Sequence, residues 1–273
     1  MHAVLLLVTG VVCLVLAALA LSNYASGQQQ NDGGGSSMGP PSGAIVARSM
    51  ADLTWGDSLV YPPGAAEEIR NIQETSPGVF RCILRHRGSW YDGDRDLQNN
   101  KEGKDKSRAE ISSIRKGMHR PYNVGETWLI GTTVKLDKDF VPARGYCNIM
   151  QPLNHQSFVN LTRIRGDVVT GGLYVFEDGI GSPITTVRTF QLRRGEWTTV
   201  VVRVRVGKDG EYGLSINGDS FVTKKFDTTK SGDRTPPFGG NWGLYSSATK
   251  NVNGGQLKDL IVDHKDIFIK KLS

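Results

Sequence analysis

Five side chains between positions 108 and 245 are of types that hold acidic groups or transfer protons. Arg108 and Glu110 stand two apart in a Ser-Arg-Ala-Glu-Ile segment, Gln151 and His155 stand four apart, and Tyr245 lies near the end of the chain. A guanidinium can grip a carboxylate through two hydrogen bonds, and an amide can donate to the same group without adding negative charge. Imidazole titrates near neutral pH, and a phenol beside cations loses its proton more readily. Together these residues could bind an acidic substrate and move protons on it.

Several other kinds of catalytic site have no support in the sequence. It contains no phosphate-binding Gly-x-x-x-x-Gly-Lys-Ser/Thr loop, no dinucleotide-binding fingerprint and no His-Glu-x-x-His pair. The five histidines are scattered without the spacing of a zinc site. No pair of carboxylates stands out at the alternate spacing that a sandwich-type glycoside hydrolase would use, so hydrolysis of sugars is the weaker hypothesis.

The elements that must position these side chains read as β-strands. From about Thr54 the apolar segments are short, often alternate with polar residues, and are separated by Gly-rich and Pro-containing turns. The clearest alternation is at Trp197–Val206, where Val200, Val202, Val204 and Val206 fall on one face. The pair Asn217-Gly218 favours a tight hairpin turn.

An all-β fold follows from the number of such segments. The sequence shows no repeat, which disfavours a propeller or a solenoid, and it offers one helical turn, at Ala65–Ile72. We expect a single β-jelly-roll sandwich of the concanavalin A type, in which a polymer would lie along the outward face of one concave sheet. Further strands are expected at Val79–Arg85, Arg108–Ile114, Trp128–Leu136, Tyr146–His155, Val159–Arg165, Leu173–Phe176, Trp242–Ser246 and Leu257–Asp263.

The first part of the chain differs in composition from this domain. Residues 1–27 include the uncharged run Ala3–Leu21, which is long enough to cross a bilayer and predicts either a signal peptide or a retained membrane anchor. Residues 28–48 are rich in Gln, Gly, Ser and Pro and predict a disordered linker. The expected domain is 49–273, and in both alternatives it lies outside the cytosol, secreted or anchored.

Charge and cysteine content add modest information. The chain has 33 basic and 27 acidic residues, a net charge of +6, which allows attraction to a polyanion. In the domain, Cys82 and Cys147 could form one disulfide or remain buried thiols on neighbouring strands. Asn160-Leu161-Thr162 is a glycosylation sequon in a strand-like segment, where use is not expected.

In their order along the chain, these segments resemble the jelly-roll polysaccharide lyases, among them heparin lyase I and fungal glucuronan lyase, with alginate lyases of the same architecture more distant. The resemblance covers about Gly78–Ile269. It rests on Arg-Ala-Glu-Ile, a Gln/His strand, Gly-Glu-Trp opening a Val-rich strand, Gly-Leu-Ser-Ile-Asn-Gly, and Gly-Leu-Tyr. This sequence departs from the family at His155, which is four residues after Gln151 instead of two, with Pro152 between them; a regular strand would still place Gln151, Leu153 and His155 on one face.

The resemblance implies cleavage of a 4-linked uronic acid polymer, glucuronan-like or alginate-like, by β-elimination. Arg108 and Gln151 would neutralise the carboxylate, Tyr245 would act as acid and also as base, and His155 would be the base if the two roles are divided. No cofactor is required. Residues expected to bind the acidic polysaccharide are Glu110, Arg115, Lys116, His119, Lys104 and Arg163.

Two alternatives stay open at this point. Asp92, Asp94 and Asp96 alternate as calcium ligands can, but Leu97 stands where an EF-hand loop needs Gly, so a solvated acidic loop is favoured over a structural calcium site. The domain could also be a carbohydrate-binding module without catalysis. A nucleic-acid partner is not expected, and a membrane partner only if the leader is retained.

Overall fold

A computed structural model describes residues 39–54, 72–84, 106–114, 122–153, 156–178, 182–230, 240–247, 251–255 and 258–273. These residues belong to one compact unit, which begins at Ser37 and ends at Ser273. Apart from the 3₁₀ helix η1 (Met50–Asp52), their regular elements are all strands. The described part of the chain therefore has the all-β fold expected from the sequence.

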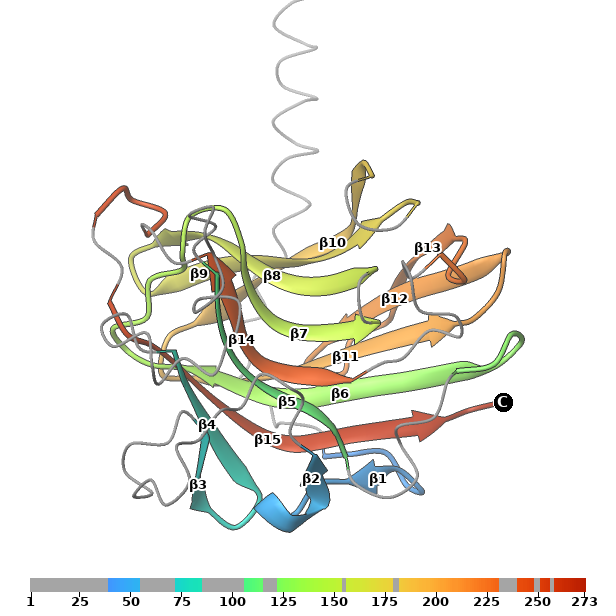
Figure 1. Cartoon of the computed structure of the whole chain (residues 1–273), viewed down its shortest axis with the longest axis horizontal. Helices are drawn as coiled ribbons and strands as arrows, with labels where there is room; N and C mark the ends of the chain where they lie inside the picture. Colours follow the sequence, from blue (N-terminus) through green and yellow to red (C-terminus); the bar gives the residue numbers. More distant parts are fainter. Residues whose placement is uncertain are drawn as a thin grey trace, which may run out of the picture. The chain divides into compact units, whose positions relative to one another are not determined.

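The strands form two antiparallel sheets, an eight-stranded sheet A and a seven-stranded sheet B, within the described residues (Figure 1). In sheet A the order is β13 (Val222–Phe226), β12 (Gly210–Ile216), β11 (Trp197–Arg205), β6 (Thr127–Leu136), β15 (Leu260–Lys271), β4 (Val79–Leu84) and β3 (Ile72–Ser76), with β1 (Ile45–Val46) paired to β15. In sheet B the order is β10 (Ile184–Arg193), β9 (Val168–Phe176), β8 (Ser157–Arg165), β7 (Cys147–Leu153), β14 (Asn241–Ser247), β5 (Lys106–Ile114) and β2 (Leu53–Thr54). This is a β-sandwich of the jelly-roll class.

The core lies between the two sheets and follows the alternation read from the sequence. Val200, Val202, Val204 and Val206 are at most 2% exposed, while Arg203 and Arg205 of the same segment lie on its outer side. The hairpin after β12 is also confirmed. Asn217 and Gly218 have φ of 51° and 80°, the left-handed values that a type I′ turn requires and that Asn and Gly tolerate best.

Three boundaries differ from the sequence-based predictions. The predicted linker extends too far, because β1 pairs with β15 and Ala47 is buried and donates its backbone N–H to the Ile267 carbonyl at 2.9 Å. Ile72, expected to end a helical turn, begins β3 instead. β15 continues eight residues beyond the predicted end at Asp263, past a register shift between Lys265 and Phe268.

The cysteine and sequon predictions have definite outcomes. Cys82 in β4 and Cys147 in β7 are both free and buried, so the disulfide alternative is wrong; they also lie in different sheets, not on neighbouring strands. Burial raises the pKa of the Cys147 thiol to about 11, which keeps it protonated and unreactive at neutral pH. Asn160 is 6% exposed and accepts a hydrogen bond from the Cys147 N–H at 2.6 Å, so it is not presented for glycosylation.

Among the described residues, no helix has the length and apolar content that crossing a bilayer requires. The expected leader, residues 1–27, lies outside those residues.

Candidate functional site

Three adjacent strands of sheet B, β5, β14 and β7, carry most of the described site residues (Figure 1). Tyr245 on β14 is the register partner of Arg108 on β5 and of Asn148 on β7. On β14 the side chains of Trp242 and Leu244 belong to the core, whereas Tyr245 is half-buried. Positions directly opposite each other in antiparallel strands share a face, so Tyr245 and its partners define the outer face of sheet B.

Gln151 and Glu110 meet on this face across the middle strand. The Gln151 side chain donates a hydrogen bond from Nε2 to Glu110 Oε1 at 2.6 Å, although β14 lies between their strands. Glu110 is the register partner of Gly243, which carries no side chain. A Cβ at position 243 would lie 2.2 Å from the Ala109 carbonyl oxygen, and the φ of Gly243 is +127°. Glycine at 243 therefore allows the close approach of β14 to β5 under this contact.

A β-bulge explains why two polar residues three apart on β7 reach the same face. Asn148 pairs with Asn160 of β8, but Met150 pairs with Val159, so Ile149 is extra in the ladder. Ile149 and Met150 both lie in the core. A second irregularity follows, and Leu153 also lies in the core cluster, so the expectation that Gln151 and Leu153 share a face is wrong.

The bulge turns toward the outer face a polar residue that the sequence-based reasoning missed. Asn148 is 6% exposed, and its Oδ1 has no hydrogen-bond partner among the described residues. A buried amide oxygen without a partner is costly, so its retention suggests a role other than stability. The signal in the sequence is a lone polar residue between Cys147 and Ile149, which regular alternation does not distinguish from a core position.

Aromatic rings extend the outer face on both sides of these polar groups. The ring of Tyr245 lies 5.1 Å from that of Tyr146, centroid to centroid. On β8 and β9, Phe158 lies 5.9 Å from Tyr174 and 5.3 Å from Phe176. These three half-buried rings, which we call the aromatic platform, were also not anticipated. Flat apolar rings beside polar groups suit the C–H faces and hydroxyl edges of sugars.

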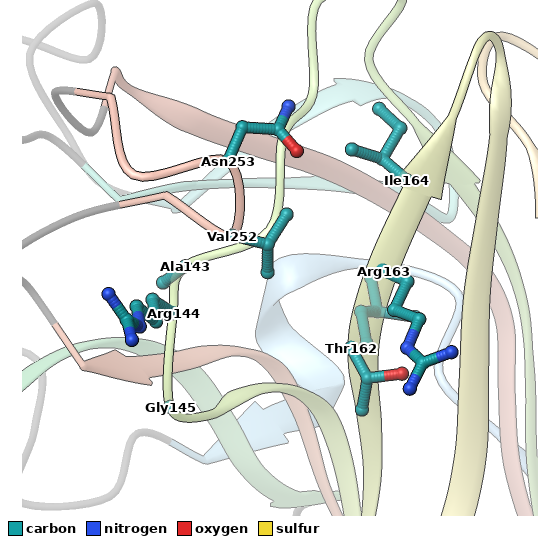
Figure 2. A pocket seen from close by; sticks show the side chains of 9 residues that line it. Ala143, Arg144, Gly145, Thr162, Arg163, Ile164, Val252 and Asn253 are labelled. Carbon is teal, nitrogen blue, oxygen red and sulfur yellow. The ribbon is translucent and has the colours of Figure 1, made fainter.

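A pocket of about 370 Å³ opens at the end of β8, between that strand, the turn at 143–145 and the turn at 252–253 (Figure 2). Arg163, expected to bind substrate, lines it together with Arg144. A register shift between Leu161 and Arg163 adds one residue to this part of β8. Leu161 before the shift and Ile164 after it both pack in or against the core, so Thr162 and Arg163 both lie outside.

The remaining predicted site residues have different outcomes. Glu110 is 0% exposed, so direct contact with a substrate, as expected for it, is not available; it contacts Gln151 instead. For Arg108 the structure gives the backbone position in β5. Within the described residues no group of His, Cys, Asp or Glu side chains is placed to hold a metal ion. Outside those residues lie His155, Lys104, Arg115, Lys116, His119, Asp92, Asp94 and Asp96.

Neither a protein-family model nor a curated protein matches the sequence. Solved structures do match in fold. Endo-β-1,4-glucuronan lyase from the fungus Trichoderma reesei is 13% identical, with a TM-score of 0.47 over 83% of this chain and 87% of that one. Alginate lyase Aly36B is 12% identical, with a TM-score of 0.47 over 84% and 97%. The binding domain of botulinum neurotoxin serotype D/C is 14% identical, with a TM-score of 0.40 over 71% and 41%.

Proposed function

We propose that this protein is a polysaccharide lyase that cleaves a 4-linked uronic acid polymer by β-elimination on the outer face of sheet B. The observation that carries the proposal is the hydrogen bond from Gln151 to Glu110 at 2.6 Å, on the face that also bears Tyr245. It fixes an amide donor on the same face of the sheet as a phenol. That combination serves the two needs of the reaction, neutralising a carboxylate and moving a proton.

Carboxylate neutralisation is assigned to Gln151 and Arg108. The Gln151 amide nitrogen has two hydrogens, and donation of one to Glu110 leaves the other for a substrate oxygen. Arg108 takes the register position opposite Tyr245 and adds the positive charge that stabilises an enolate-like transition state. Asn148, the other register partner of Tyr245, supplies a further amide at the same place.

The reaction moves one proton off carbon and one onto oxygen. The base takes the C5 proton, the electron pair of that bond forms the C4–C5 double bond, and the C4–O4 bond breaks. Tyr245 then gives a proton to the departing O4. The base is Tyr245 in its phenolate form or His155, which follows β7 by two residues; comparing variants at the two positions decides between them.

Glu110 acts as a positioning residue in this scheme. Because it is fully buried and accepts from Gln151, it orients the amide toward the face without touching the polymer. The aromatic platform of Phe158, Tyr174 and Phe176 would hold neighbouring sugar rings. Since the apolar run Ala3–Leu21 precedes the domain, we place the activity outside the cytosol, on a secreted or anchored protein.

The proposal is tested by mixing the full-length chain in turn with polyglucuronate, polymannuronate, polyguluronate, heparin and hyaluronan while recording ultraviolet absorbance. Elimination creates a conjugated double bond that absorbs, and hydrolysis does not. A rise with one polymer supports the proposal and names the substrate. A folded protein that binds one of these polymers without any rise would instead be a carbohydrate-binding module.

A further inference from the structure

The pocket at the end of β8 has the composition of a site for an acidic sugar. Its apolar wall is formed in part by Val252 and Ile164, and its polar groups are Arg144, Arg163, Thr162 and Asn253. Figure 2 shows the 143–145 turn on one side, Thr162 and Arg163 on the other, and Val252 and Asn253 above. Its volume, about 370 Å³, falls in the range of pockets that hold small ligands.

The charge of this pocket is uncompensated within the described residues. Arg144 and Arg163 are exposed, neither has an ion-pair partner among those residues, and none of the lining residues is acidic. Several other arginines of the described residues, Arg81, Arg188 and Arg203 among them, each pair with a carboxylate. Two free guanidiniums at one small concavity favour an anion, and the planar guanidinium matches a carboxylate.

The pocket continues the face that carries the proposed reaction. Thr162 follows Asn160 by two residues on β8, a distance of roughly 7 Å along a strand, and Asn160 is the register partner of Asn148. On the other wall, Gly145 adjoins Tyr146, whose ring contacts Tyr245. The Ser247 hydroxyl of β14 donates to the Arg144 carbonyl oxygen, so this wall is also tied to the strand of Tyr245.

We propose that this pocket is a second binding site for the polymer, which holds the carboxylate of a uronate unit several sugars away from the bond that is cleaved. The inference rests on the proposed function for the identity of the polymer. The carboxylate binds Arg163, Arg144 on the opposite side of the pocket adds a second positive charge, and the apolar side of the sugar ring packs on Val252. The Thr162 hydroxyl and the Asn253 amide contact the ring hydroxyls. Long chains that reach both sites bind more tightly than short ones.

The test compares wild-type protein, the double variant Arg144→Ala/Arg163→Ala, and Arg205→Ala, which removes an exposed arginine from sheet A as a matched control. Binding of the cleaved polyuronate, a uronate trisaccharide, the methyl-esterified polymer and dextran sulfate is measured by calorimetry at low salt. The Tyr245→Phe background prevents turnover. We expect the double variant to bind the long polyuronate about five- to tenfold more weakly. The trisaccharide, which is too short to reach both sites, should lose less affinity, and the neutral ester and the control should behave as with wild type.

Each result has a definite consequence. An equal loss in the Arg205→Ala control, or no loss in the double variant, overturns the second site while leaving cleavage by the wild type intact. Loss of binding to dextran sulfate but not to polyuronate overturns the carboxylate assignment in favour of a sulfate ester. The expected loss in a protein that cleaves no polymer supports the pocket and contradicts the lyase. Absence of wild-type binding to every polymer overturns both.

Discussion

Gln151 and Glu110 are joined by a hydrogen bond of 2.6 Å that passes over an intervening strand. Their strands, β7 and β5, both pair with β14, and strand spacing places them nearly 10 Å apart. Two extended side chains bridge that distance over Gly243. The contact gives a buried carboxylate a partner and gives the Gln151 amide one orientation, which is the condition for using its second hydrogen in binding.

Replacing Glu110 tests whether this orientation supports turnover. Glu110→Ala removes the acceptor, so the Gln151 amide is no longer held, and we expect kcat to fall roughly ten- to a hundredfold with a smaller change in KM. Glu110→Gln keeps an oxygen that can accept the same hydrogen bond, so it should recover most of the lost kcat. Steady-state kinetics of both variants, with circular dichroism to verify folding, give the comparison. Wild-type kcat in folded Glu110→Ala would remove Glu110 from the site.

Gly243 should be intolerant of any side chain. Gly243→Ala adds a Cβ that meets the Ala109 carbonyl oxygen at 2.2 Å and strains a φ of +127°. Gly254→Ala is the matched control, because its φ is also positive, +81°, but its Cβ would meet nothing within 4 Å. Backbone strain alone costs about 1–3 kcal/mol, so denaturant unfolding should show a clearly larger loss for Gly243→Ala. Equal losses would mean that β14 and β5 can move apart without cost.

Substitution by Leu should raise the free energy of unfolding at Asn148 and lower it at Asn160. Asn148→Leu removes a buried oxygen without a partner among the described residues, so we expect the free energy of unfolding to rise, by about 1 kcal/mol, while turnover falls. Asn160→Leu removes the acceptor of the Cys147 N–H, so stability should fall. Thermal unfolding and the absorbance assay measure both effects. A less stable Asn148→Leu with full activity would contradict a functional role for that amide.

The parts of the fold that follow local rules could be predicted from the sequence. The buried face of Val200–Val206 follows from the alternation of side chains along a strand, and the turn at Asn217-Gly218 follows from the preference of this pair for hairpins. Both predictions were confirmed. The strand β10, Ile184–Arg193, was missed because its polar and apolar residues do not alternate cleanly. The end of β15 was missed because Asp266 adopts a φ of +50° at an irregularity that resets the alternation.

The site was predictable in its residue types but not in its geometry. Gln151 and Tyr245 were selected by chemistry, and the structure brings them to neighbouring strands. The bulge at Ile149 decides that Asn148 shares their face, and a bulge depends on pairing with β8, which no local pattern encodes. Burial of Glu110 likewise depends on the strand packed beside it, which the sequence does not reveal. The expectation that Glu110 contacts the substrate directly was therefore wrong.

Because His264 is buried in its neutral form, we expect the protein to lose stability in mild acid. His264 is fully buried in β15, its Nδ1 lies 3.2 Å from the Thr132 hydroxyl, and burial lowers its pKa from 6.5 to about 4, an effect that Asp263 partly offsets. Below pH 6.5 the unfolded chain takes up a proton that the folded chain excludes. The free energy of unfolding therefore falls as the pH drops from 6.5 toward 4, by about 3 kcal/mol in total.

The variant His264→Gln separates this effect from the titration of carboxylates. Burial acts to raise the pKa of Glu126, but hydrogen bonds from Lys271 and Asn123 outweigh it and lower the pKa to about 2. Its stabilising effect is consequently lost only below pH 4.5. Denaturant unfolding between pH 7 and 4.5 should show a flatter dependence for His264→Gln than for wild type. The same slope in both proteins would assign the effect to other groups.

The most direct test of the central claim is to measure cleavage and binding of the same polyuronate by Tyr245→Phe. The variant removes one hydroxyl, and Tyr122→Phe, in the core, is the control for loss of a tyrosine hydroxyl elsewhere. The proposed lyase predicts that Tyr245→Phe binds the polymer as wild type does but produces no rise in ultraviolet absorbance, while Tyr122→Phe cleaves normally. A Tyr245→Phe protein that cleaves at the wild-type rate would contradict the account.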